Sequence, residues 1–205
     1  FVAGATNAGG FLAVRQYTSH MTGIVSAMAD NLALSQLGLV LDGLGALLSF
    51  LLGAAASAVM INYARRERMH SEFALPLLLE ASLLLCFGLL GGQMAKIEGL
   101  FVPLTVMLLC FIMGLQNALI TKLSGAEIRT THITGMITDI GIELGKLFYW
   151  NRVHLKQPDV LANRRHLRVL AAQVSFFFGG GLIGALGFKH LGYFSTVWLA
   201  LLLIV

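Results

Sequence analysis

Apolar residues run along most of this chain in long stretches, and short polar segments separate them. Residues 43–62, 73–92, 100–121 and 169–188 each approach the roughly 20 residues that an α-helix needs to cross a bilayer. The two ends, 1–14 and 192–205, are apolar but shorter, and we expect each to be part of a further span. With the polar residues as boundaries, the predicted membrane helices cover about 1–14, 41–63, 73–93, 100–121, 168–188 and the residues from 192 onward.

Two shorter segments between these spans are also predicted to be helical. They cover about 21–35 and 133–147, and a helix of that length reaches only about 22 Å at ~1.5 Å per residue. This is too short to cross a membrane comfortably. Each segment is therefore either a strained full span or a re-entrant half-helix.

The same motif stands at the start of both short segments. Ser19-His20-Met21-Thr22-Gly23 matches Thr131-His132-Ile133-Thr134-Gly135, 112 residues further on. Two more pairs follow the same order: Gly4-x-x-Asn7-Ala8 with Gly114-x-x-Asn117-Ala118, and Ser49-Phe50-x-x-Gly53 with Ser175-Phe176-x-x-Gly179. Three pairs in one order indicate a duplicated chain. We predict a first repeat over 1–95 and a second over 100–205, within one membrane domain.

Basic residues distinguish the two interpretations of the short segments, because Lys and Arg gather in cytoplasmic loops. If both segments cross the membrane, the 14 Lys and Arg divide seven and seven between the two sides. If both are re-entrant, three (Arg15, Lys96 and Lys189) lie on one side and eleven on the other. The second arrangement follows the rule, so we predict six spans with both termini in the cytoplasm. Each half then holds three spans, and the two repeats are inverted relative to each other, which is the usual plan of transporters and channels.

Composition supports a membrane protein and argues against other classes. The chain is 57% hydrophobic and 12% charged, whereas soluble domains carry about 25% charged residues. Cytoplasmic loops account for the net charge of +4, so we expect no nucleic-acid partner. Cys86 and Cys110 lie inside apolar runs, which indicates packing as small hydrophobic side chains. The sequence contains no phosphate loop, zinc pattern or dinucleotide fingerprint, and we expect no metal and no cofactor.

The repeated motifs are the main candidates for a functional site. A half-helix that begins inside the membrane presents unpaired backbone N–H groups and the positive end of its dipole there. If the two half-helices enter from opposite faces, their N-termini meet near the midplane. We therefore predict a transporter or channel that binds a small polar or anionic solute between them. The predicted binding residues are His20, Thr22, Gly23, His132, Thr134 and Gly135, with Asn7 and Asn117 from the adjoining spans.

Each of these residues also has a structural explanation. Glycine lets a solute reach the backbone, threonine offers a hydroxyl, and histidine can donate, accept or titrate near neutral pH. In the structural alternative, Thr22 and Thr134 simply cap their helices, and the histidines satisfy broken backbone. Asn7 is either a site residue or a polar link between helices.

Two acidic residues are candidates for carrying a coupling proton. Glu80 lies about 10 Å into its span at ~1.5 Å per residue, where a carboxylate must pair, protonate or face water. It is either a proton carrier or a structural tie to a basic residue. Asp139 is the second candidate, and it shares a helix face with Glu143.

Two alternatives to transport stay open. An intramembrane enzyme, which we do not expect, would need His20 and His132 together with a carboxylate such as Glu80. A non-transporting scaffold subunit would fill the space between the motifs with side chains. Gly180-x-x-x-Gly184 and Gly53-x-x-x-Ser57 allow tight helix crossings. Such crossings more often pack within one subunit, although they also leave a homodimer open.

Three segments resemble the YoaK family of bacterial integral membrane proteins, and the similarity covers essentially the whole chain. They are Ala3-Gly4-x-x-Asn7-Ala8-x-x-Phe11-Leu12, Ser19-His20-Met21-Thr22-Gly23 and Met113-Gly114-Leu115-Gln116-Asn117-Ala118. The resemblance implies a multi-pass protein of about six spans in the bacterial cytoplasmic (inner) membrane. It implies little about activity, because the family is uncharacterised.

The chain departs from the family pattern at two positions. Asn7 stands where the family usually has Asp, and Ile24 stands where Asn usually follows the Thr-Gly pair. If those positions bind solute or protons, this member differs from its relatives in coupling or substrate.

Overall fold

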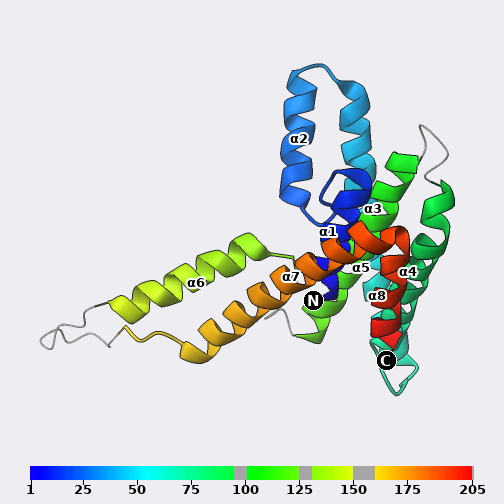
Figure 1. The fold of residues 1–205 in the computed structure, drawn as a ribbon. Coiled ribbons are helices and arrows are strands. Elements are labelled where there is room, and N and C mark those ends of the chain that lie inside the picture. The colour runs from blue at the N-terminus through cyan, green and yellow to red at the C-terminus, as the bar shows by residue number, and fades with distance from the viewer. Residues whose placement is uncertain (95–100, 125–130, 150–159, 205) are drawn as a thin grey trace, which may run out of the picture.

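The computed structural model describes residues 1–94, 101–124, 131–149 and 160–204, and all regular structure in these ranges is helical (Figure 1). Lys96, Arg129, Arg152 and Lys156, four of the basic residues on which the predicted topology depends, lie outside them. In chain order the elements are α1 (Val2–Val14), α2 (Met21–Ala33), α3 (Leu37–Arg66), α4 (Ala74–Met94), α5 (Phe101–Leu123), α6 (Ile133–Phe148), α7 (Arg164–Leu191), the 3-10 turn η1 (Gly192–Phe194) and α8 (Ser195–Ile204).

Length and apolar composition explain which helices can span a bilayer. Among the described residues four stretches qualify: Leu37–Arg66, Ala74–Gly91, Val102–Leu123 and Arg164–Ile204. The last contains both α7 and α8, which η1 divides where Gly192 adopts a φ of +60°. α1 is a shorter apolar helix of 13 residues. The prediction of an all-α polytopic membrane protein is therefore confirmed, while four stretches rather than six reach the length of a span.

The two predicted short helices are present, with slightly different ends. α2 has 13 residues and α6 has 16. After each one the chain turns back, so that α2 packs against α3 and α6 against α7. Figure 1 shows both pairs extending from the body of the molecule as two arms that point in different directions. We call α2 with the start of α3 the first arm, and α6 with the start of α7 the second arm.

Backbone contact between glycines and facing helices fixes the α3–α5 pair. A side chain at Gly53 would collide with the backbone of Phe111, and one at Gly114 would collide with the backbone of Phe50. Small residues allow helices to approach this closely in a membrane, where packing and not the hydrophobic effect drives association. The two helices run in the same direction, side by side (Figure 1).

The α1–α7 pair repeats this contact. A side chain at Gly180 would collide with the backbone of Phe1, and one at Gly4 would collide with the backbone of Phe177. Gly184 makes a third such contact, with the backbone of Ala5. The tight crossings expected at the Gly-x-x-x-Gly and Gly-x-x-x-Ser patterns are therefore found within the one chain.

These contacts correct the register of one predicted motif pair. The motif comparison aligned Gly53 with Gly179, but the residue of α7 that makes the equivalent backbone contact is Gly180. The space beside Gly179 is open, with no atom within 4 Å of where its Cβ would lie. Runs of Phe at 176–178 and Gly at 179–181 let the sequence match in more than one register, and helix packing selects between them.

α4 and α8 form a third pair and run antiparallel. Thr196 on α8 donates hydrogen bonds to the carbonyl oxygen of Leu84 on α4 at 3.0 Å and to that of Tyr193 at 2.9 Å. Leu84 belongs to a buried apolar cluster that joins these helices to α1 and α5. The body therefore consists of the three helix pairs α1–α7, α3–α5 and α4–α8, and the two arms extend from it (Figure 1).

Candidate functional site

Helix α2 begins directly after His20, and α6 begins directly after His132. Each histidine is the N-cap: its carbonyl accepts the first helical hydrogen bond, from Ile24 N at 3.1 Å and from Met136 N at 3.0 Å. The alternative in which Thr22 and Thr134 are the caps is therefore wrong. No side chain in the described part of the chain caps either start. The first-turn N–H groups are thus available to water or a ligand.

Asn7 and Asn117 hold the segments that lead into the two histidines. Oδ1 of Asn7 accepts hydrogen bonds from the Oγ of Ser19 at 2.9 Å and from its backbone N at 3.3 Å. Oδ1 of Asn117 accepts one from Oγ1 of Thr131 at 2.8 Å. These bonds support the explanation of Asn7 as a polar link and give Asn117 the same role: each asparagine ties a turn to the body of the preceding helix.

A cavity of about 620 Å³ lies between the two helix starts, and we call it the motif cavity. Residues of both motifs line it, together with side chains from α3 and α5. No acidic, lysine or arginine side chain belongs to its described wall. The lining residues are Ser19, His20, Met21, Thr22, Phe50, Asn117, Thr121, Thr131, His132, Thr134 and Gly135. The structure therefore brings together six of the eight predicted binding residues.

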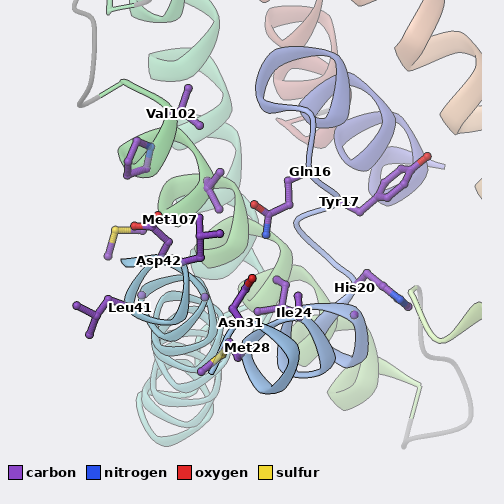
Figure 2. Close-up of a pocket in the computed structure, with 17 residues that line it drawn as sticks. Gln16, Tyr17, His20, Ile24, Met28, Asn31, Leu41, Asp42, Val102 and Met107 are labelled. Atoms are coloured by element: carbon purple, nitrogen blue, oxygen red, sulfur yellow. The ribbon is translucent and has the colours of Figure 1, made fainter. Parts of the chain in front are cut away.

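A second cavity, of about 670 Å³, lies between α2, the start of α3 and the start of α5 (Figure 2). We call it the lateral cavity. Ile24, Met28 and Met107 contribute to its largely apolar wall, and Gln16 reaches into it from the turn after α1 (Figure 2). His20 lines the lateral cavity as well as the motif cavity, so this residue belongs to the walls of both.

The two histidines sit differently against their motif glycines. A Cβ at Gly23 would overlap Cδ2 of His20, so the imidazole is folded onto this glycine. At Gly135 the nearest atom to such a Cβ is Nδ1 of His132, at 3.9 Å, which is ordinary contact. The repeated sequence therefore produces two unequal halves of the site.

Four predicted residues lie outside the motif cavity. Gly23 lines the lateral cavity instead, and Asn7 is buried behind Ser19. Glu80 lines neither cavity, and Asp139 lies on the exposed surface of α6. The structure does not bring either carboxylate to the histidines, as the intramembrane enzyme alternative would need.

Glu80 is a buried carboxyl between α4 and α5. Its side chain is fully buried, and its Oε1 accepts a hydrogen bond of 2.7 Å from Nε2 of Gln116. Among the described residues its partner is therefore a neutral amide, and not the basic residue that the sequence left open.

Five lining residues of the motif cavity were not predicted as site residues: Ser19, Met21 and Thr131, which belong to the two motifs, and Phe50 and Thr121 from the adjoining helices. Thr121 lies one helical turn after Asn117 and on the same face of α5, so helix periodicity could have indicated it as a site residue. Phe50 belongs to a repeated motif, but an apolar side chain gave no chemical reason to include it. Glu143, the neighbour of Asp139 on the same helix face, instead ties the second arm together: it accepts hydrogen bonds from Lys146 Nζ at 2.8 Å and Asn163 N at 2.6 Å.

Long apolar helices, glycine-mediated helix pairs and a polar cavity between two helix starts define a polytopic α-helical membrane protein. Comparison with known sequences gives its family. The chain belongs to DUF1275, a family described as a protein of unknown function, whose sequence profile matches residues 1–205. It is 28% identical over 206 residues to the UPF0700 transmembrane protein YoaK of Bacillus subtilis (strain 168), with 98% of this chain and 86% of the relative covered. The resemblance to the YoaK family is thus confirmed. No solved structure matches the chain.

Proposed function

We propose that this protein is a transporter or channel for a small polar or anionic solute, which binds in the motif cavity. One observation carries the proposal: two copies of one motif, distant in the sequence, begin two short helices and line the same cavity. The wall carries polar side chains from both motifs, and polar groups inside a membrane are usually functional.

The chemistry of the cavity wall favours a neutral polar or anionic solute over a cation. Both helices direct uncapped first-turn N–H groups toward their starts, and a helix N-terminus carries a partial positive charge. Thr22, Thr121 and Thr134 add hydroxyls, and His20 and His132 can donate or accept. Carboxylates would favour a cation, and the described wall has none.

An inverted repeat in the membrane is part of this proposal. α1 packs beside α7 and α3 beside α5 through equivalent glycine contacts. In Figure 1, α1 rises where its counterpart α5 descends. We propose six membrane crossings in a bacterial cytoplasmic membrane, with α2 and α6 as re-entrant half-helices and both termini in the cytoplasm. In that plan, the arms are the elements that move to expose the cavity to one side and then the other.

Reconstitution into liposomes tests the solute site. Uptake is followed by stopped-flow light scattering with a panel of small probes, such as formate, acetate, urea and glycerol. The double variant Thr22→Val and Thr134→Val removes two cavity hydroxyls while preserving side-chain volume. Thr138→Val is the matched control, because it removes a hydroxyl from the exposed surface of α6 that bonds only its own helix, at 2.9 Å to Thr134 O.

We expect at least one probe to enter faster than in protein-free liposomes, the double variant to slow it, and Thr138→Val to leave it unchanged. Equal slowing by the double variant and the control would contradict a solute site in the motif cavity. Uptake no faster than in empty liposomes for every probe, with folded protein in the bilayer, would favour the scaffold alternative.

A further inference from the structure

A pair of buried polar side chains lies away from both cavities, between α4 and α5. Glu80 is 0% exposed and Gln116 is 5% exposed, and one hydrogen bond of 2.7 Å joins Gln116 Nε2 to Glu80 Oε1. Each side chain has one more oxygen atom, which takes no part in this hydrogen bond. Glu80 Oε2 and Gln116 Oε1 are buried and have no hydrogen-bond partner within the described residues. The pair therefore has two unused acceptors and lacks a donor between them.

An ionised Glu80 does not supply that donor. A carboxylate and an amide oxygen both only accept hydrogen bonds. Ionisation would also leave a charge in an apolar interior with a single neutral partner, which is costly inside a membrane protein. The protonated carboxyl avoids both problems, because it is neutral and carries one O–H donor.

No basic side chain compensates the carboxyl in the described part of the chain. The ion pairs within these residues join Arg65 to Glu72 and Lys146 to Glu143, and Glu80 takes part in neither. The elements packed against α4 are α3, α5, η1 and α8. The titratable or charged side chains on these elements and on α4 itself, in the described ranges, are Asp42, Tyr63, Arg65, Arg66, Cys86, Cys110, Lys122 and Tyr193.

We propose that Glu80 and Gln116 form a proton-binding site in which the carboxyl stays protonated at neutral pH. Oε2 of Glu80 donates to Oε1 of Gln116, while Nε2 of Gln116 donates to Oε1 of Glu80, so that two hydrogen bonds close a ring between α4 and α5. When the proton leaves to water, one of these bonds is lost and a charge remains. Release therefore requires water to enter between the two helices, which couples the protonation state to their separation.

This proposal does not rest on the solute site, and its test needs no solute. Infrared difference spectra of the full chain in lipid nanodiscs, recorded between pH 7 and pH 10, report the carbonyl stretch of a protonated carboxyl. We expect this band at pH 7, its loss at alkaline pH, and its absence in Glu80→Gln. Glu143→Gln, which removes the other glutamate that is buried among the described residues, is the matched control and should keep the band.

The partner residue has a separate readout. Gln116→Leu removes both hydrogen bonds, so the band should shift to higher frequency. Glu80→Gln retains one donor and one acceptor on the same skeleton, and its unfolding midpoint should fall less than that of the native protein between pH 7 and pH 9. The native protein should lose stability over that range, because the folded form holds a proton that the unfolded form releases.

Three results would overturn the proposal: no protonated carboxyl band in the native protein at pH 7, a band that persists in Glu80→Gln, or an unchanged frequency in Gln116→Leu. If Glu80→Gln does not fold, two measurements still test the proposal: the carbonyl band of the native protein at pH 7, and the frequency of that band in Gln116→Leu.

Discussion

The hydroxyl of Ser19 donates a hydrogen bond of 2.9 Å to Oδ1 of Asn7, and this bond joins the turn before α2 to the middle of α1. Thr131 and Asn117 form the equivalent bond at 2.8 Å in the second half. In both halves the next residue along the chain is the histidine that begins the short helix. The two asparagines therefore position the histidines in the wall of the motif cavity, although Asn7 does not line the cavity itself.

Asn7→Ala tests this positioning role. Removing the acceptor leaves the Ser19 hydroxyl and N–H without their partner, so we expect a loss of about 1–3 kcal/mol in stability. Asn7→Asp keeps an acceptor oxygen in the same place and should stay close to the native protein. Thermal unfolding in detergent measures both variants. Equal destabilisation by the two substitutions would show that the bond to Ser19 is not what Asn7 contributes.

Adjacent glycines in α7 provide the test of helix packing. Gly180→Ala inserts a methyl group against the backbone of Phe1, and overpacking of this kind costs about 1–3 kcal/mol. Gly179→Ala meets no atom within 4 Å and should be neutral, or gain about 0.5–1 kcal/mol because alanine favours the helix. Thermal unfolding should therefore show a lowered midpoint for Gly180→Ala and an unchanged or raised one for Gly179→Ala. If Gly179→Ala were the harmful one, Gly180 would not be the residue of α7 that packs against α1.

Helix α7 illustrates how much of the fold could be predicted from the sequence. The two short helices and the contribution of His20 and His132 to one cavity followed from repeated motifs and from helix lengths. For Gly53 the sequence allowed two registers: matching letters pair it with Gly179, whereas the Gly-x-x-x-Gly and Gly-x-x-x-Ser patterns pair it with Gly180. Only contact with α1 selects Gly180. Local pattern predicts which segments pair, whereas side-chain packing decides the exact residue.

The candidate site shows the same limit in chemical terms. Glu80 was singled out because a carboxyl in an apolar run is costly, but its partner Gln116 lies on another helix and carries no charge to suggest the pairing. Phe50 could not be assigned to the cavity because aromatic side chains are common throughout such helices. Asp139 was the opposite case: its helix was predicted correctly, but the structure leaves it on the exposed face of α6.

The turn between α3 and α4 should respond to acid. Arg65 Nε donates a hydrogen bond of 2.6 Å to Glu72 Oε2, and this bond lowers the pKa of Glu72 below its ordinary value. A lowered folded-state pKa means that the stabilisation is present above the unfolded-state pKa and is lost as pH falls through the folded-state value. Both side chains are solvent-exposed, so the effect is small. Glu72→Gln should lower the unfolding midpoint at neutral pH and converge with the native protein in acid; a constant difference at every pH would contradict the ion pair.

Thiol labelling in intact cells tests the proposed topology. Met69→Cys lies after α3 and Ala162→Cys before α7, and the inverted six-span plan puts both in the cytoplasm. In a Cys86→Ala, Cys110→Ala background, an impermeant maleimide should therefore label neither position until the cells are opened. Thr18→Cys is unsuitable as a control because Thr18 is buried, so Arg15→Cys, which the plan places on the opposite side, serves for access. Labelling of only one of the two loop positions would overturn the inverted repeat.

The unequal packing of the two histidines gives a test of how solute reaches the motif cavity. Because the His20 ring lies on Gly23 and borders both cavities, Gly23→Ala must push this ring aside. Gly135→Ala adds the same methyl group at the equivalent position, but there it makes only ordinary contact with His132. For any probe that the native protein takes up, we expect Gly23→Ala to change the rate by roughly tenfold, equivalent to about 1.4 kcal/mol in the barrier. Gly135→Ala should leave the rate within about twofold of native, since less than about half a kcal/mol is involved. If both variants change uptake equally, the imidazole of His20 does not control passage between the two cavities.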